Sequence, residues 1–166
     1  MKSDTIIKIR PIHKDDKEAV LAVYKSGWLE TYPNKDNDIS LKSVQKVVDG
    51  FVTTSIHKNK YVAEISGRVC GVISIKEGDV CTIQALYVSK QYQGRGVGTK
   101  LLNFVFNKYG PVTYELKVAQ YNHKAIEFYK KFGFGIVPDS LSFEKVNDLE
   151  IPQLTMCRCV TARSPQ

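Results

Sequence analysis

The sequence predicts a three-layer mixed α/β domain, in which a mostly antiparallel sheet is flanked by helices. Three runs rich in Val, Ile and Tyr within residues 60–88, separated only by short turns, predict an antiparallel meander. Apolar residues at helical spacing on both sides of that meander predict amphipathic helices that cover the two faces of the sheet. At 166 residues, the chain has the size of one domain. We expect that domain over residues 1–163 and a loose tail over 164–166.

The expected elements follow one another without an internal repeat. Residues 6–10 predict a strand that Pro11 ends, because proline lacks the amide that pairs with a neighbouring strand. Residues 14–30 show the one-sided apolar spacing of a helix, and a second helix is expected over 39–51, with Ser40 as its N-cap. The remaining expected elements are strands over 60–65, 68–75 and 80–88, a helix over 98–109, a strand over 112–118, a helix over 123–132, and strands near Phe134 and over 154–160.

Composition restricts the classes of protein to which the chain can belong. No apolar run approaches the ~20 residues that a bilayer requires, and the polar first residues lack the apolar core of a secretory signal, so we expect a cytoplasmic protein without a membrane partner. Three histidines and four cysteines without a Cys-x-x-Cys pair give poor support to a metal site. We expect the cysteines to be buried reduced thiols, namely Cys70, Cys81, Cys157 and Cys159.

The positive charge of the chain is concentrated in one stretch. The formal net charge is +7, and residues 86–131 hold eight Lys and Arg against two acids. A small polyphosphate ligand bound to that stretch would account for the excess without a nucleic-acid surface. A solvated basic face and a nucleic-acid-binding module are the alternatives.

A glycine-rich loop lies at the start of this basic stretch. Residues 86–99 run from a predicted strand into a predicted helix, with Gly94, Gly96 and Gly98 between them. Successive backbone amides near a helix start form a nest for anions, and phosphates are the natural guests. The pattern also occurs in ordinary flexible turns. A dinucleotide-binding fold would place its glycines near the first strand, and no Gly-Lys-Ser/Thr follows here, so neither common nucleotide motif fits.

Two linked segments resemble the GNAT superfamily of acyl-CoA N-acyltransferases. Residues 93–98, QGRGVG, resemble the family's Gln/Arg-x-x-Gly-x-Gly/Ala signature. Residues 122–134 resemble its Asn-x-x-Ala-x-x-Phe-Tyr segment ending in Gly-Phe, in which Asn122 also suits a helix N-cap. The resemblance implies a GNAT-like fold and acetyl-CoA as cosubstrate, whose pyrophosphate the loop amides bind. The coenzyme-binding residues it implies are Leu86, Tyr87, Val88, Gln93, Gly94, Arg95, Gly96, Val97, Gly98, Thr99, Asn122, Ala125, Phe128, Tyr129 and Lys131.

Tyr129 is the candidate general acid. Aminolysis of a thioester expels a thiolate, and a phenol held beside the sulfur can donate a hydrogen bond or a proton to it. With reference pKa values of about 10 for tyrosine and about 8.5 for a thiol, full transfer is uphill by roughly 2 kcal/mol, so the hydrogen bond itself is the larger contribution. The alternative is a packed tyrosine with a bonded hydroxyl. The resemblance further implies that a main-chain N–H near Leu86, beside a bulge, stabilises the oxyanion.

The residues on the amine side are less sharply defined. Many relatives carry a glutamate base on the strand before the glycine loop, whereas this chain has Gln84, which is no base at neutral pH. Glu64, Glu30 or an ordered water chain are the alternatives. Residues 28–32 resemble a Trp-x-x-Thr-Tyr segment that lines the acceptor groove in some small acetyltransferases, although Trp28 equally suits a core anchor. The candidate substrate-binding residues are Trp28, Glu30, Tyr32 and Gln84.

These residues predict transfer of an acetyl group to a primary amine by direct attack in a ternary complex. Residues 132–156 hold four acids against one lysine, which favours a small cationic acceptor such as a polyamine. A protein N-terminus or an amino-acid-like amine is the alternative acceptor, and a homodimer is left open. The competing hypothesis is a non-catalytic CoA- or nucleic-acid-binding regulatory module, which Gln84 keeps in play.

Overall fold

The computed structural model describes residues 6–51 and 59–160. Within these ranges the strands form one eight-stranded sheet in the order β1-β2-β3-β4-β5-β8-β6, with β7 paired to β8. Pairing is antiparallel except between β4 and β5, so the predicted mixed, mostly antiparallel sheet is confirmed. The predicted tail lies outside the described residues.

The elements follow the predicted order with one addition. Their bounds are β1 (Ile7–Pro11), α1 (Lys17–Thr31), α2 (Leu41–Asp49), β2 (Lys60–Ile65), β3 (Arg68–Lys76), β4 (Val80–Val88), α3 (Val97–Tyr109), β5 (Thr113–Ala119), α4 (His123–Lys130), β6 (Gly135–Ile136), β7 (Ser142–Val146) and β8 (Leu149–Arg158). Short 3-10 turns lie at Lys14–Asp16, Lys35–Asn37 and Lys90–Tyr92. The sequence did not predict β7, and β8 begins earlier than the expected residue 154.

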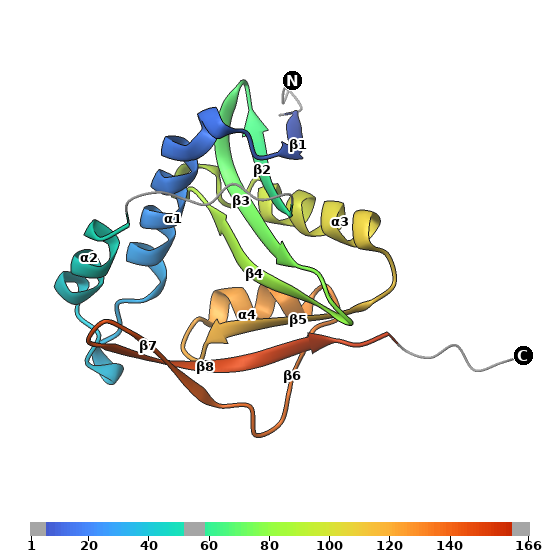
Figure 1. The fold of residues 1–166 in the computed structure, drawn as a ribbon. Coiled ribbons are helices and arrows are strands. Elements are labelled where there is room, and N and C mark those ends of the chain that lie inside the picture. Colours follow the sequence, from blue (N-terminus) through green and yellow to red (C-terminus); the bar gives the residue numbers. More distant parts are fainter. Residues whose placement is uncertain (1–5, 52–58, 161–166) are drawn as a thin grey trace, which may run out of the picture.

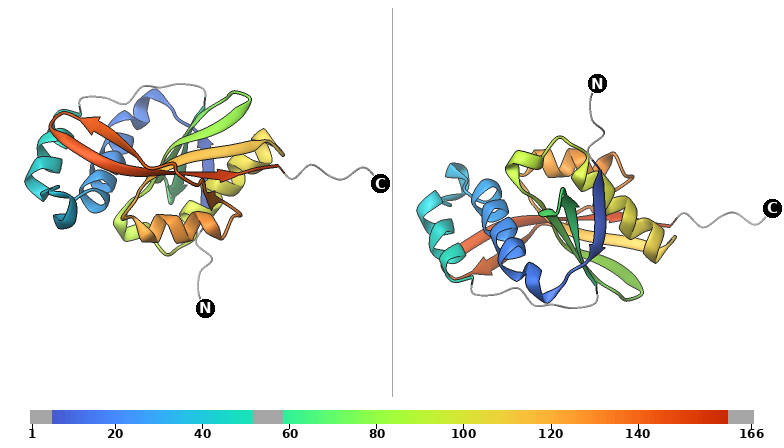
Figure 2. Two further views of the ribbon diagram at one scale, coloured as in Figure 1. Left: turned by 90° about the horizontal axis from the view of Figure 1, so that it is seen from below. Right: turned by 90° about the horizontal axis from the view of Figure 1, so that it is seen from above.

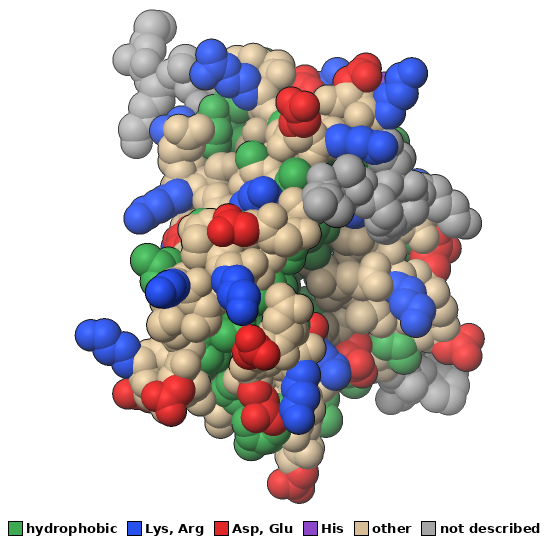
Figure 3. Space-filling view, turned by 60° about the vertical axis from the view of Figure 1, so that its left-hand side comes forward, with side chains coloured by type: hydrophobic (Ala, Val, Ile, Leu, Met, Phe, Trp, Pro, Cys, Tyr) green, Lys and Arg blue, Asp and Glu red, His purple; other side chains and the backbone are tan. Residues whose placement is uncertain are grey.

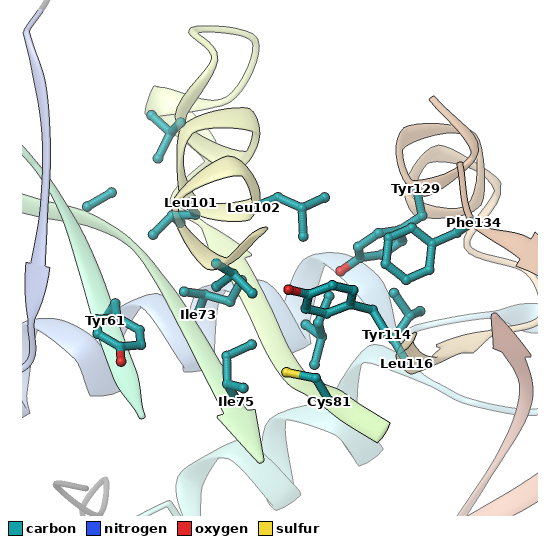
Figure 4. Packing of buried hydrophobic residues seen from close by; sticks show 14 of the residues in the cluster. Tyr61, Ile73, Ile75, Cys81, Leu101, Leu102, Tyr114, Leu116, Tyr129 and Phe134 are labelled. Atoms are coloured by element: carbon teal, nitrogen blue, oxygen red, sulfur yellow. The ribbon is translucent and has the colours of Figure 1, made fainter. Parts of the chain in front are cut away.

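Helices cover both faces of the sheet. Figures 1 and 2 show α1 and α2 on one side of the strands and α3 and α4 on the other. Alternate residues of the central strands follow this division: Val72 packs with α1, whereas its neighbour Ile73 packs with α3. The larger core, shown in part in Figure 4, lies on the α3 and α4 side and includes Leu101 and Tyr114, both fully buried.

The sheet opens between β4 and β5. Their parallel pairing runs from Val80 opposite Thr113 to Ile83 opposite Leu116, and β4 then continues to Val88 without this partner. The register between β3 and β4 shifts at the same level, which leaves Gln84 as the extra residue of a β-bulge. Because a bulge increases the local twist, it turns the end of β4 away from β5.

The cysteine prediction is half right. Cys70 and Cys81 are buried, as expected. Cys157 is only half-buried and Cys159 is exposed, so the prediction of buried thiols was wrong for this pair, which lies where β8 ends at the rim of the sheet. Their sulfur atoms lie 2.6 Å apart, and burial raises the pKa of Cys157 to about 11.

Over residues 6–51 and 59–160, no helix combines the length and the apolar character that crossing a bilayer requires.

Candidate functional site

A cleft of about 700 Å³ lies beside the C-terminal part of β4, which is no longer paired with β5. Its walls come from the end of α1, the end of β4, the loop before α3 and the start of α4. The lining residues are Gly27, Glu30, Thr31, Pro33, Asn34, Leu86, Tyr87, Val88, Tyr92, Gln93, Gly94, Gly96, Val97, Gly98, Thr99, Tyr121, Asn122, His123, Lys124, Ala125, Phe128 and Tyr129.

The glycine loop presents a row of backbone amides to this cleft. Gly94 and Gly96 adopt left-handed φ angles of 71° and 81°, and Gly96 caps α3 without a side chain. In the described part of the chain, the amides from Gly94 to Thr99 have no protein acceptor. Gln93 differs, because its amide donates to the Lys90 carbonyl at 3.2 Å. Free amides at a helix start attract anions, so the local geometry suits a phosphate group.

The end of β4 presents further main-chain groups to the same cleft. The Ser89 amide donates to the Cys70 carbonyl at 2.9 Å, and this bond shows which residues of β4 are hydrogen-bonded to β3 in the antiparallel ladder. Because paired residues alternate in such a ladder, Tyr87 bonds to β3, whereas Leu86 and Val88 turn their amides and carbonyls toward the gap left by β5. An extended amide-containing ligand can therefore pair with Leu86 and Val88 as a strand would.

The Gln93 side chain ties three walls of the cleft together. Its Nε2 donates to Glu30 Oε2 and to the Val88 carbonyl, both at 3.0 Å. Its Oε1 accepts from Lys124 Nζ at 2.7 Å. This one side chain thus joins α1, β4 and the start of α4. The closeness of α3 and α4 has a similar basis, since a Cβ on Gly98 would lie only 3.3 Å from the Phe128 ring.

Tyr129 stands at the inner end of the cleft. Its side chain packs against Phe128 and Phe134, with ring centroids 5.2 and 5.5 Å away, and only 8% of the residue is exposed. Figure 4 shows the ring beside Phe134 with its hydroxyl turned away from α4. Burial, and to a smaller extent Tyr32, raise the pKa of Tyr129, so the phenol keeps its proton at neutral pH. Among the described residues, no hydrogen-bond partner engages that hydroxyl.

Three further tyrosines surround the end of α1. The hydroxyls of Tyr32 and Tyr87 lie 3.4 Å apart, and the Tyr121 hydroxyl donates to the Tyr32 carbonyl at 2.7 Å. Gly27 makes this packing possible, because a Cβ there would lie 2.3 Å from the Tyr87 ring. Burial raises the pKa of Tyr87 well above its ordinary value. Tyr87 and Tyr121 are part of the cleft wall, and Tyr32 contacts both of them.

The other candidate acceptor-side residues lie at varying distances from the cleft. Glu30 is part of its wall. Gln84 is exposed in the bulge and accepts from Ser74 Oγ at 3.4 Å, outside the cleft wall. Trp28 packs on Tyr32 and Phe51, with centroids 4.4 and 5.3 Å away, which supports the core-anchor alternative.

Three charged residues lie outside the cleft wall, although the backbone amide of one of them, Arg95, belongs to the row from Gly94 to Thr99. Arg95 and Lys131, both implied by the resemblance, are not part of the cleft wall. Arg95 instead lies over the Tyr92 ring at 5.5 Å. Glu64 accepts from Arg10 Nε at 2.9 Å on the far strands β1 and β2. The sequence did not indicate Pro33, Asn34 or Tyr92 as wall residues, because they lie in turns without a motif.

Comparison with known proteins identifies the family. Residues 18–134 match the acetyltransferase (GNAT) family, and this span covers most of the chain. The chain belongs to the acetyltransferase (GNAT) family. The cleft just described is the candidate active site of a GNAT protein.

Three relatives place the chain within this family. Uncharacterized N-acetyltransferase MJ1207 of Methanocaldococcus jannaschii is 34% identical over 45% of this chain, and the match spans only 38% of that protein. Peptidyl-lysine N-acetyltransferase YiaC of Escherichia coli is 26% identical over 78% of this chain and 84% of its own. Spermidine N(1)-acetyltransferase of Escherichia coli is 21% identical over 95% of this chain and 88% of its own. Because the first match spans well under two-thirds of that protein, activity and substrate are inferred from the site.

A solved structure shows the same GNAT fold. The PaiA N-acetyltransferase from Thermoplasma acidophilum, in complex with coenzyme A, superposes with a TM-score of 0.62 at 19% identity. The superposition covers 93% of this chain and 99% of that one. The likeness at this identity establishes the fold.

Proposed function

We propose that this GNAT enzyme transfers the acetyl group of acetyl-CoA to a primary amine by direct attack in a ternary complex. The observation that carries the proposal is the row of unpartnered amides from Gly94 to Thr99, beside the cleft-facing main chain of Leu86 and Val88. The first set suits a pyrophosphate, and the second suits the amides of a pantetheine arm. When bound, acetyl-CoA supplies the activated thioester.

The chain's own residues bind and orient the coenzyme in this proposal. The amides of Gly94, Gly96 and Gly98 donate to phosphate oxygens, and the Thr99 hydroxyl adds a further donor. The Oδ1 atom of Asn122 already accepts from the Ala125 amide at 3.2 Å, so its Nδ2 is the group left to meet a pantetheine carbonyl. Lys124, on the same wall, adds a positive charge.

Two groups assist the chemical step. The amide of Leu86 faces the gap and is placed to stabilise negative charge on the acetyl oxygen as the amine attacks. Tyr129, protonated at neutral pH and buried among aromatic rings, donates its hydrogen bond to the departing sulfur. Glu64 takes no part in proton removal, because Arg10 holds its carboxylate at 2.9 Å on β2, which β3 separates from β4.

The acceptor we propose is a small cationic amine. Two of the named relatives act, by their names, on spermidine and on peptidyl-lysine, and both substrates carry a primary amine on a flexible alkyl chain. Tyr87 and Tyr121 belong to the cleft wall, and Tyr32 contacts both of them, so aromatic surface is available to an alkyl chain bound there. A small cationic amine is favoured over a peptide because residues 132–156 hold four acids against one lysine.

The test is a thiol-release assay with acetyl-CoA and a panel of amines. The panel contains spermidine, single amino acids and a lysine-containing peptide. We expect release of CoA thiol above the rate of acetyl-CoA hydrolysis, fastest with the diamine or polyamine. Release at background rate with every amine, together with salt-sensitive binding to RNA or DNA, would instead identify a binding module.

A further inference from the structure

The hairpin of β7 and β8 presents a polar group to the acceptor end of the site. In its register, Ser142 lies opposite Gln153 and Glu144 lies opposite Ile151. Because directly opposed residues of an antiparallel pair point to the same face, Ser142, Glu144, Ile151 and Gln153 share one face of the hairpin. Ile151 is fully buried in the cluster that Tyr32 joins, so this face is turned toward the end of α1.

Glu144 is held in a defined orientation on that face. Gln153, with only 5% of its surface exposed, donates from Nε2 to Glu144 Oε2. Burying a glutamine amide is unfavourable unless it is bonded, so this contact constrains both side chains. It leaves Oε1 of the Glu144 carboxylate available to a ligand, and Glu144 itself is exposed to solvent.

Ser142 supplies a second polar atom to the same place. Its Oγ is buried and has no hydrogen-bond partner among residues 6–51 and 59–160. An unpartnered buried hydroxyl is costly, and such exceptions in folded proteins call for a ligand or an ordered water. Since Ser142 is two residues from Glu144 along one strand, both side chains reach the same space.

Tyr32 connects this polar group to the catalytic cleft. Its neighbours Thr31 and Pro33 form part of the cleft wall, and its hydroxyl lies 3.4 Å from that of Tyr87. Tyr32 packs against the same cluster as Ile151, the residue that lies opposite Glu144 in the hairpin. The Tyr32 pKa is raised mainly by burial and also by the negative charge of Glu144, while the hydrogen bond with Tyr87 opposes the rise. Tyr32 thus contacts Tyr87, a residue of the cleft wall, and packs against the cluster that includes Ile151 of the hairpin.

We propose that Glu144, oriented by Gln153 and assisted by Ser142, binds a second cationic group of the acceptor, so that the preferred substrates are diamines and polyamines. The inference rests on the proposed acetyl transfer. An ammonium group has three N–H donors, and Glu144 Oε1 and Ser142 Oγ are the acceptors available to it. The reacting amine must reach the thioester beside Tyr129, so the group at Glu144 is the other end of the acceptor.

Local contacts, rather than the general charge of the surface, carry this specificity. Figure 3 brings this side of the molecule forward and shows acidic and basic side chains interspersed over it. Lys145 and Glu150 are opposed to each other in the hairpin and, by alternation, point to the face opposite Glu144. Glu150 is therefore a matched control, with the same charge on the same hairpin.

The decisive comparison uses Glu144→Gln and Glu150→Gln with two acceptors of equal length, 1,4-diaminobutane and n-butylamine. We expect Glu144→Gln to raise KM for the diamine by about tenfold or more, because a charged hydrogen-bond partner is lost. kcat for the diamine, and kcat/KM for the monoamine, should change by less than about twofold. Ser142→Ala should produce a smaller rise in KM of the same kind. Glu150→Gln should leave both substrates unchanged.

Two results would overturn the inference. One is a diamine KM that Glu144→Gln and Glu150→Gln shift equally, and the other is an equal loss for monoamine and diamine. Calorimetry with 1,4-diaminobutane separates this failure from failure of the proposed activity. If no amine is acetylated, the acetyl-transfer proposal fails. Diamine binding that is lost only in Glu144→Gln would still support the subsite at Glu144. Absence of diamine binding in the parent enzyme would rule that subsite out.

Discussion

Tyr129 has the two properties that a proton donor to sulfur requires. It is buried among aromatic rings at the inner end of the cleft, and that burial raises its pKa, so its proton is retained at neutral pH. Its hydroxyl also points away from its own helix, as Figure 4 shows. A hydrogen bond to a thiolate that forms only as the thioester breaks stabilises the transition state more than the ground state.

Replacing Tyr129 with Phe tests this role. We expect Tyr129→Phe to lower kcat by about ten- to a hundredfold while KM for acetyl-CoA changes by less than about twofold, because the contact grows in the transition state. Steady-state kinetics of thiol release measures both constants. Tyr109→Phe is the control, since that hydroxyl bonds to Tyr61 at 2.9 Å away from the cleft. Equal kcat values for parent and Tyr129→Phe would remove this tyrosine from catalysis.

The sequence predicted local site features better than non-local ones. Asn122 and Tyr129 lie in one short segment whose resemblance to the family signature implied that both meet the coenzyme, and Asn122 is indeed the N-cap of α4. Glu144 was counted only as one of several acids, because its contact with Gln153 depends on how β7 pairs with β8. Glu64 was considered as a base because the sequence does not show that Arg10 lies beside it across two strands.

At the scale of the element, the loop that starts α3 carries the coenzyme proposal. Gly96 needs its left-handed φ of 81°, and a Cβ there would meet no other described residue within 4 Å, so it would project into the open space beside the loop. Gly67 in the turn between β2 and β3 has the same property, with a φ of 76° and open space around it. The two glycines therefore have similar backbone strain, but only Gly96 lies at the cleft.

Alanine at these two positions separates ligand contact from strain. Both Gly96→Ala and Gly67→Ala should lower the free energy of unfolding by about 1 kcal/mol, because alanine disfavours positive φ. Only Gly96→Ala should weaken acetyl-CoA binding, by about tenfold or more. Urea unfolding and calorimetry give the two quantities. An equal loss of affinity in both variants would mean that the loop contributes through stability alone.

The strands were predicted well where alternation is strong and poorly where it is not. The bounds of β2 and β4 agree with the expected 60–65 and 80–88, since both runs are apolar and end at small turns. β7 was missed because its five residues are largely exposed and include two charges, so nothing but its pairing with β8 marks it as a strand. The start of β8 was predicted too late, because Pro152 lacks the backbone N–H that a strand residue donates to its neighbour.

At the scale of the whole molecule, one charged cluster joins the first strand to the first helix. Arg10 at the end of β1 donates to both carboxylate oxygens of Asp16 at 2.7 and 2.9 Å, just before α1 begins. This side-chain bond is the main cause that lowers the pKa of Asp16. α1 forms one wall of the cleft, so the cluster also positions the acceptor side.

The pH dependence of stability should report this cluster. A lowered folded-state pKa means that Asp16 stabilises the fold fully above the ordinary carboxyl pKa of about 4, and that this contribution is lost as pH falls through the lower value. We expect Asp16→Asn to lower the free energy of unfolding by about 1 kcal/mol at pH 7, with the difference shrinking below about pH 4. Denaturant unfolding across pH measures it. A difference that does not change with pH would contradict the assignment.

The measurement that tests the central claim most directly is an acetyl-CoA titration followed by backbone amide NMR. The account predicts saturable binding, with the largest amide shifts from Gly94 to Thr99 and clear shifts at Leu86 and Val88. The Gln93 amide, already bonded to Lys90, should move less than these. Binding that leaves the amides from Gly94 to Thr99 unchanged, or no binding at millimolar acetyl-CoA, would contradict the account.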